Sequence, residues 1–379
     1  MDHQKIRWQC NCIEEADQAR GGEIRAIRER RLRADSSPTG TLNSWPRIFS
    51  IFLRIALVAI ALLVLRRELD GVALADLFAG LRSYGFRRLA LGLAFTAASF
   101  LTLGILELLA LRYVGKRAQR IIPRRTAIAT AFIAHAYSQS VGLAILTGTT
   151  VRVRSYSRYG LDGLDVARLS VFVTITATLG LITTGALAFL TTPGRASFLG
   201  FSVSLIPIGL LLVLPIFAYV TWGAFGQSDF HGRGKWRIRR PSLVLALEQI
   251  GISSLDWVLA GTVLFFMLPP SLHVSYSGLL GVYLVAQMVA VLSHVPGGAG
   301  VFEAIVLAIL TAPGQGRVTS PSLTASLVAS LFVYRVIYYL LPLCGALALA
   351  GIAEVIRSRR PTASLNAAPA PLPPARLSA

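Results

Sequence analysis

The chain carries little charge for its length. Only 15% of its 379 residues are Asp, Glu, Lys or Arg, whereas 54% are hydrophobic. Soluble domains contain about 25% charged residues, so this deficit excludes an ordinary soluble globular protein. Long apolar runs occupy most of the chain, and about 20 apolar residues are enough to cross a bilayer as a helix. The composition therefore predicts an all-α polytopic membrane protein.

Acidic residues are the scarcer of the two charge types. The chain has 18 Asp and Glu against 37 Lys and Arg, which gives a formal net charge of +19. On a soluble protein this excess would indicate nucleic-acid binding. Here the arginines fall in short loops and in the N-terminal tail, where they set orientation and contact anionic lipid head groups. We therefore expect a membrane and lipids as partners, and no nucleic acid.

Cysteines and catalytic motifs are also scarce. Cys10, Cys12 and Cys344 form neither a disulfide framework nor a zinc pattern, because no further ligand pair stands at the required spacing. The chain shows no nucleophile elbow, no phosphate-binding glycine loop of the Walker type and no metal-ligand pair on one helix face. We expect no enzyme activity, no cofactor and no metal. Without an ATP site, any transport would be passive or ion-coupled.

The apolar runs divide the chain into a membrane domain and two tails. Residues 1–46 form a basic tail without the apolar core of a signal peptide, and residues 357–379 form an Ala/Pro-rich tail; both are expected to be cytoplasmic and disordered. The domain 47–356 is expected to contain about six full spans, at 48–65, 89–111, 166–191, 198–220, 243–268 and 323–356, the last interrupted by Pro342. Residues 66–88 favour an amphipathic helix at the interface. Basic loops predict a multi-pass membrane protein with both termini in the cytoplasm.

Two further apolar segments are broken by polar or flexible residues. Residues 126–150 are flanked by positive charge on both sides, which favours a re-entrant hairpin turning near 138–142 over a crossing helix. Residues 277–312 contain Pro296, Gly297, Gly298 and Gly300. They predict either a second re-entrant hairpin, entering from outside, or two spans with a break at the cytoplasmic end. Two hairpins from opposite sides would form an inverted repeat whose tips meet near the midplane.

Ionisable residues in apolar sequence are the first candidates for a site. Glu303 stands in the first turn after the glycine break, and Arg335 lies in the last span with Tyr338 on its face three residues on. A guanidinium in a cavity suits a lipid phosphate. The alternative is structural: Glu303 caps a helix, and Arg335 pairs with a carboxylate such as Glu303 or Asp256.

A second group of candidates follows the first broken segment. Arg152, Arg154 and Arg158 alternate with tyrosines and predict an interfacial head-group site, with ordinary orienting charge as the alternative. Further polar residues fall in apolar runs and are candidates for a polar cavity: His135, Gln139, Glu248 and His294.

Four stretches together resemble the membrane region of the lysylphosphatidylglycerol synthase/flippase family (multiple peptide resistance factor) and its stand-alone relatives of the YbhN type. They are Gly148-Thr-Thr-Val-Arg152 with Arg154-Ser-Tyr-Ser-Arg-Tyr-Gly160, Leu255-Asp-Trp-Val-Leu-Ala260, Ser293-His-Val-Pro-Gly-Gly-Ala-Gly-Val-Phe-Glu303, and Tyr334-Arg-Val-Ile-Tyr-Tyr-Leu-Leu-Pro342. The resemblance covers roughly residues 48–356. It implies a flippase domain that moves an aminoacylated anionic phospholipid, typically lysyl-phosphatidylglycerol, to the outer leaflet, with a link to antimicrobial peptide resistance. Arg152, Arg154, Asp256, Glu303 and Arg335 fall on matching motif positions.

The chain departs from the full-length pattern of that family, whose members carry a C-terminal aminoacyl-transferase domain. Here an Ala/Pro tail follows the membrane domain, so we expect no synthesis of the lipid by this chain. The leading hypothesis is a lipid flippase or transporter. The alternative is a non-transporting membrane partner of a separate lipid synthase or envelope enzyme. The sequence leaves open whether the chain forms a homo-oligomer.

Overall fold

Long apolar helices dominate the part of the chain that the structure describes. The computed structural model describes residues 85–141, 144–191, 195–198, 201–226, 230–231, 238–293, 295–311 and 321–358, all within the unit Val58–Ala379. Five stretches there are long and apolar enough to cross a membrane: α4 (Phe86–Val114), α8 (Gly163–Thr191), α9 (Leu205–Phe225), α10 (Leu243–Met267) and Ser326–Val355. They coincide with five of the six predicted spans, so the all-α membrane class is confirmed. The predicted span 48–65, the tail 1–46, nearly all of the amphipathic segment 66–88 and nearly all of the tail 357–379 lie outside the described residues.

The last span is divided in three. It consists of α13 (Pro321–Arg335), the π-helical turn η4 (Val336–Leu340) and α14 (Leu341–Ser358). Pro342 has no backbone N–H and therefore cannot donate the helical hydrogen bond that its position would require. The turn before it widens, and π-helical turns of this kind are frequent at functional sites. The expected interruption at Pro342 is thus a π-turn.

The segment predicted as the first hairpin is a pair of helices. After the short helix α5 (Lys116–Ile121), α6 (Arg124–Val141) and α7 (Ala144–Tyr156) pack against each other and are joined by only two residues, and the 3₁₀ turn η1 (Ser157–Tyr159) follows. Thr147 donates to the Ser138 hydroxyl across the pair at 3.2 Å. The segment therefore reverses direction and is not one crossing helix. We call α6 and α7 the first hairpin.

The Pro-Gly-Gly segment is also a hairpin. A 3₁₀ turn η2 (Pro270–Leu272) leads into α11 (Tyr276–Leu292), which is followed by the 3₁₀ turn η3 (Pro296–Gly298) and α12 (Val301–Leu310). The 10 residues of α12 span only about 15 Å, half the thickness of a hydrocarbon core. Helix α12 packs back along α11 and is too short to be a second full span, so the segment forms a hairpin. We call α11, η3 and α12 the second hairpin.

Strands occupy only loops in the described residues. Strands β1 (Arg195–Phe198) and β2 (Phe201–Ser204) pair antiparallel, as do β3 (Phe230–His231) and β4 (Ile238–Arg239). The predicted span 198–220 is therefore wrong at its start, since the helix begins only at Leu205. Residues 201–204 alternate apolar and polar side chains, with Phe and Val among them, a pattern that favours a strand.

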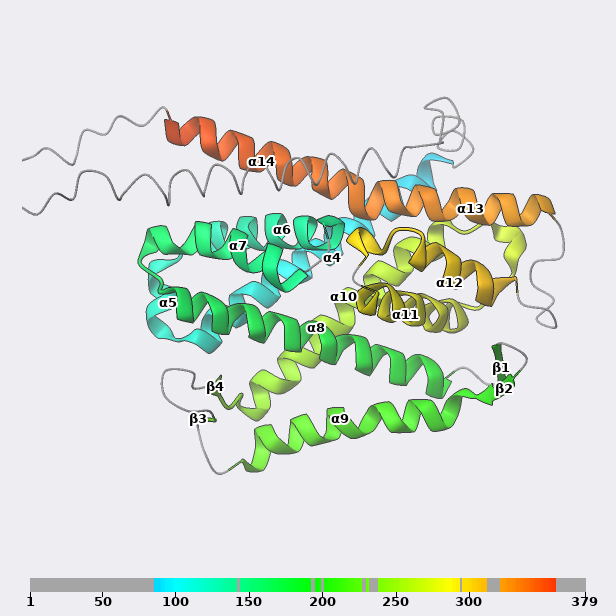
Figure 1. The fold of residues 1–379 in the computed structure, drawn as a ribbon, viewed down its shortest axis with the longest axis horizontal. Coiled ribbons are helices and arrows are strands. Elements are labelled where there is room, and N and C mark those ends of the chain that lie inside the picture. Colours follow the sequence, from blue (N-terminus) through cyan, green and yellow to red (C-terminus); the bar gives the residue numbers. More distant parts are fainter. Residues whose placement is uncertain are drawn as a thin grey trace, which may run out of the picture. The chain divides into compact units, whose positions relative to one another are not determined.

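The two hairpins lie beside each other, with α13 and α14 along one side of them (Figure 1). The order long helix, hairpin, long helix occurs twice: α4, first hairpin, α8, and then α10, second hairpin, α13–α14. Helix α10 packs along both α4 and α8 and so links the two halves. Helix α9 packs mainly on α8 and leaves large apolar side chains exposed, as expected of a helix that faces lipid.

Candidate functional site

The break of the second hairpin is built from glycines in the left-handed backbone region. Gly297, Gly298 and Gly300 have φ values of 63°, 61° and 78°. A side chain at Gly298 would also place its Cβ 2.7 Å from the Cβ of Ala290 on α11. Only glycine therefore allows the chain to turn this closely against the preceding helix.

Glu303 closes the start of the helix that follows the break. Its Oε2 accepts a hydrogen bond from the backbone N–H of Gly300 at 2.8 Å, as the cap prediction required. The carboxylate also lies at the N-terminus of α12, where a negative charge is favourable. Its side chain is 24% exposed.

Arg335, at the end of α13, holds both the carboxylate and the break. Its Nε donates to Glu303 Oε1 at 2.6 Å and its Nη2 to Glu303 Oε2 at 3.1 Å. Its Nη1 and Nη2 donate to the carbonyl oxygens of Gly297 and Gly298 at 2.5 and 3.1 Å. The predicted structural pair is therefore Arg335 with Glu303, and the guanidinium additionally ties up backbone carbonyls that the broken helix leaves unpaired.

The tips of the two hairpins meet at this point. A Cβ on Gly297 would lie 3.3 Å from the backbone oxygen of Ser140 and 3.4 Å from Nη1 of Arg335. Gln139 Oε1 and Ser140 Oγ, at the tip of the first hairpin, are buried and make no hydrogen bond. Buried polar atoms without partners are rare and call for an explanation such as a water, an ion or a ligand. Predicted residue His294 lies outside the described residues.

A cluster of tyrosines packs behind Arg335. The guanidinium carbon lies 4.9 Å from the ring centre of Tyr339 and 5.9 Å from that of Phe302. Tyr338, which was expected to share a face with Arg335, instead stacks on Tyr334 and points to Ser99. In a helix the residues three and four positions on are both neighbours, and here Tyr339 packs on the guanidinium while Tyr338 turns toward α4.

Asp256, another predicted site residue, does not contact Arg335. Its Oδ1 accepts hydrogen bonds from Ser99 at 2.5 Å and Thr102 at 3.3 Å, both on α4. Ser99 in turn shares a hydrogen bond of 2.9 Å with the Tyr338 hydroxyl. Asp256 therefore reaches the Arg335 segment only through Ser99 and Tyr338. Neither Ser99 nor Thr102 was predicted, because a hydroxyl in an apolar helix carries no distinctive sequence signal.

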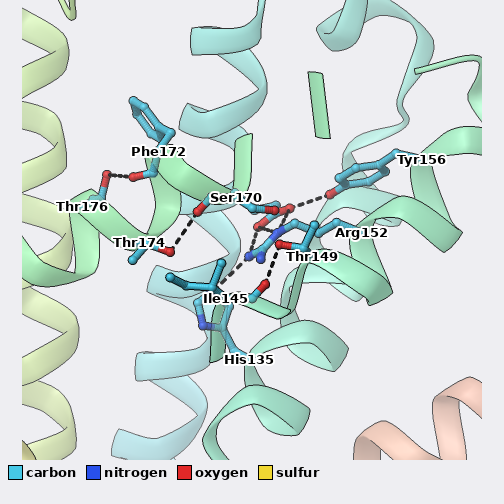
Figure 2. Close-up of polar contacts among 10 residues, drawn as sticks. His135, Ile145, Thr149, Arg152, Tyr156, Ser170, Phe172, Thr174 and Thr176 are labelled. Atoms are coloured by element: carbon cyan, nitrogen blue, oxygen red, sulfur yellow. Dashed lines mark hydrogen bonds and ion pairs between the residues drawn. The ribbon is translucent and has the colours of Figure 1, made fainter. Parts of the chain in front are cut away.

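A second arginine–glutamate pair lies inside the first half of the domain. Arg152 on α7 donates from Nε to both carboxylate oxygens of Glu107 on α4, at 2.9 and 3.1 Å, and from Nη2 to Oε2 at 2.8 Å. Tyr156 donates to the same carboxylate at 2.8 Å, and His135 Nε2 lies 3.5 Å from Nη2, as drawn in Figure 2. The Arg152 and Glu107 side chains are 5% and 0% exposed. This pair is buried deep within the protein.

The arginines predicted to form one interfacial site lie in three environments. Arg152 is buried, Arg154 pairs with Glu354 of α14 at 2.7 Å, and Arg158 is exposed on η1. Glu248, predicted as a cavity residue, pairs with Arg112 at 3.1 Å near the end of α4, where both side chains are partly exposed. The structure thus brings together Gln139, Glu303, Arg335 and the glycines of the break, and separates Arg154, Arg158 and Glu248 from them.

One cavity in the described region involves none of the predicted residues. It has a volume of about 420 Å³ and lies between the start of α4 and the end of α10. Arg87, Arg88, Phe265, Phe266 and His273 are among its lining residues. The sequence does show two adjacent arginines at the start of an apolar helix. By itself, however, this pattern predicts residues at the membrane interface and not a cavity.

Known proteins resemble this chain over most of its length. The uncharacterised protein slr0712 of Synechocystis sp. is 30% identical over 326 residues, which are 84% of this chain and 97% of that protein. The inner membrane protein YbhN of Escherichia coli is 29% identical over 76% of this chain and 86% of that protein. No protein-family model matches the chain.

Phosphatidylglycerol lysyltransferases match only in part. The enzyme of Staphylococcus aureus is 23% identical over 80% of this chain, but the matched region is 34% of that protein. The chain therefore corresponds to about a third of the length of the lysyltransferase and to nearly the whole length of the first two relatives.

Proposed function

Because the chain belongs to the family of membrane proteins that includes YbhN and the membrane part of phosphatidylglycerol lysyltransferases, we propose that it is a lipid transporter. It moves an anionic phospholipid, such as phosphatidylglycerol or its lysyl ester, between the leaflets of the bacterial inner membrane. Both termini lie in the cytoplasm. The synthase activity in the lysyltransferases' name is not part of the proposal, since the chain matches only about a third of their length.

The meeting of the two hairpin tips carries this proposal. Each tip interrupts helical backbone inside an apolar domain, and a membrane tolerates such interruptions only where protein or a wet cavity surrounds them. Broken helices of this kind form the substrate sites of many transporters. Here Arg335 joins the break of the second hairpin, while Gln139 Oε1 and Ser140 Oγ remain buried without partners at the other tip.

The Arg335–Glu303 pair suits a charge-balanced exchange with a lipid head group. A phosphate that replaces the carboxylate on Arg335 keeps the guanidinium paired, because both anions accept two parallel hydrogen bonds from it. The carboxylate that is released can pair with the ammonium groups of a lysyl ester. The 24% exposure of Glu303 gives the head group access, whereas Arg335 is only 4% exposed. Arg154 and Arg158 would attract anionic head groups toward the domain.

A non-transporting partner of a separate synthase is the second candidate. In this structure four hydrogen bonds already join Arg335 to Glu303 and to the glycine break. Such bonds are also expected if Arg335 only stabilises the fold and binds no lipid. Activity of the purified protein alone distinguishes the two candidates, since a mere partner would move no lipid.

The test is a leaflet assay with proteoliposomes that contain only this protein and fluorescent phosphatidylglycerol or lysyl-phosphatidylglycerol. We expect faster movement of at least one lipid, reduced tenfold or more by Glu303→Gln, which keeps the cap but loses the charge. Arg335→Ala should abolish movement. The matched control is Asp165→Asn, which removes a carboxylate paired with Arg168 within α8. No movement of either lipid by the wild type, or equal rates in all variants, would contradict the proposal.

A further inference from the structure

Asp256 differs from the other helical carboxylates that the structure describes in having no arginine partner. The others each form a salt bridge: Glu107 with Arg152, Asp165 with Arg168, Glu248 with Arg112, Glu303 with Arg335 and Glu354 with Arg154. Asp256 receives only the hydroxyls of Ser99 and Thr102. It nevertheless lies in the middle of α10, a 25-residue helix apolar enough to span the membrane.

An ionised carboxylate without a cation is costly in such a place, and two neutral hydroxyls offset only part of that cost. A bound proton removes the charge. Hydroxyls suit both states, because each can donate to a carboxylate or accept from a carboxylic acid. We propose, building on the lipid-transport function above, that Asp256 is a proton-binding site whose protonation drives the movement of the lipid through Ser99 and Tyr338.

Within the described part of the chain, the side chains that contact Asp256 through hydrogen bonds are uncharged. From α4 it faces Ser99 and Thr102, and the phenols of Tyr338 on η4 and Tyr283 on α11 interact with it electrostatically. On the side of α8, the neighbours of Asp256 contact neutral groups: Trp257 donates to the Ala177 carbonyl, and Thr184 donates to the Ser254 carbonyl. Among the described residues, no Lys, Arg or His forms a hydrogen bond or ion pair with Asp256.

The hydrogen bonds around Asp256 can reverse direction when the proton binds. With Asp256 ionised, Ser99 donates to Oδ1, and the Tyr338 hydroxyl donates to Ser99. With the proton on Asp256, its O–H donates to Ser99, Ser99 donates to Tyr338, and Tyr338 must direct its own proton elsewhere. The proton comes from water on one side of the membrane and leaves to water on the other, so charge and atoms balance.

The π-turn connects this change to the lipid site. Tyr338 lies in η4, which begins directly after Arg335, and its ring stacks on that of Tyr334 with centroids 5.5 Å apart. Tyr339 in the same turn packs under the guanidinium. A change in the hydrogen bond of Tyr338 therefore acts on the same turn that positions Arg335 against the hairpin break.

Two measurements test this inference. Infrared difference spectra of the purified protein between acidic and alkaline pH should show a protonated carboxyl band that Asp256→Asn removes and Asp165→Asn retains. Absence of a band specific to Asp256 would overturn the proton site even if lipid movement is observed. Asn accepts the same hydroxyl bonds, and the melting temperature in detergent verifies that the variant is folded.

The second measurement imposes a pH gradient on the proteoliposomes and follows both lipid movement and the pH inside the vesicles. We expect the gradient to change the wild-type rate several-fold, protons to move with the lipid, and Asp256→Asn to lose this dependence while Asp256→Glu keeps part of it. A rate of lipid movement that is independent of the pH gradient would overturn the proposed coupling of lipid movement to protons. An Asp256 band without any lipid movement would support the proton site and contradict the transport function, so the two failures are distinguishable.

Discussion

Each half of the domain contains an arginine–glutamate pair that joins the second arm of a hairpin to a long helix. In the first half, Arg152 on the second arm of a hairpin pairs with Glu107 on the long helix before it. In the second half, Glu303 on the second arm pairs with Arg335 on the long helix after it. In the first pair the hairpin carries the arginine and the long helix the glutamate, and in the second pair the arrangement is reversed.

The two pairs differ in their additional hydrogen-bond partners and in the exposure of the carboxylate. Glu107 is fully buried, and its oxygens are shared by Arg152 and Tyr156, so no acceptor capacity faces outward. Glu303 is a quarter exposed, and Arg335 also holds carbonyls of a broken helix. The Arg152–Glu107 pair is therefore closed to a ligand, whereas the Arg335–Glu303 pair is partly accessible, as the proposed exchange with a head group requires.

Arg152→Ala should produce the largest loss of stability in this comparison. It leaves Glu107 buried without its cation, and removal of one partner from a buried pair costs about 3–5 kcal/mol. We expect little folded protein, measured as the monodisperse fraction in detergent and as the melting temperature. The double variant Glu107→Met with Arg152→Met should recover most of the folded yield, because replacement of both partners by apolar side chains is often neutral. A single variant with the wild-type melting temperature would show that this pair does not stabilise the fold. A double variant whose folded yield is no higher than that of the single variant would show the same.

Gly298→Ala should have an intermediate effect that is concentrated at the lipid site. The added methyl group would approach Ala290 to 2.7 Å at a φ of 61°, which is unfavourable for alanine by about 1–3 kcal/mol. The break must shift, and with it the carbonyl that accepts from Arg335. We expect a lower melting temperature together with a slower leaflet rate. Gly251→Ala, on α10 with open space around it, is the control and should lower neither. Equal behaviour of the two variants would argue against a tight requirement at the break.

Arg112→Ala should have the smallest effect. Arg112 and Glu248 are 52% and 35% exposed, and pairs of this kind contribute less than about 1 kcal/mol. We expect an unchanged melting temperature at low and high salt and a leaflet rate close to the wild type. A large loss of lipid movement in this variant would show that the Arg112–Glu248 pair takes part in transport.

The sequence alone predicts the long helices and the first hairpin, and for the second broken segment it leaves a hairpin and two spans as alternatives. Hydropathy identifies α4, α8, α10 and the last span, because about 20 apolar residues in a row have few alternatives to crossing a bilayer. The positive charge on both sides of the first hairpin predicts its reversal, and the glycines predict the break of the second. The start of α9 is the exception, since four residues of alternating character form a strand there instead.

Sequence spacing does not predict which side chains contact Arg335. Helical spacing allows either Tyr338 or Tyr339 to contact Arg335, and the structure shows that Tyr339 does so. The grouping of Arg152 with Arg154 and Arg158 failed for a similar reason. Neighbours along a chain can lie in a buried core, at an ion pair and on the surface within two helical turns.

By itself, the sequence determined that this protein is helical, crosses a membrane, breaks one apolar segment at Pro296 and carries a few ionisable residues inside it. These features depend on the local balance between apolar side chains, backbone hydrogen bonds and lipid. Only the tertiary structure decided that Arg335 pairs with Glu303 and that Arg152 pairs with Glu107. It also decided that Asp256 receives, among the described residues, hydrogen bonds from the hydroxyls of Ser99 and Thr102 alone. Partners of buried charges are set by which helices pack together, and these residues are separated by tens to more than a hundred positions in the chain.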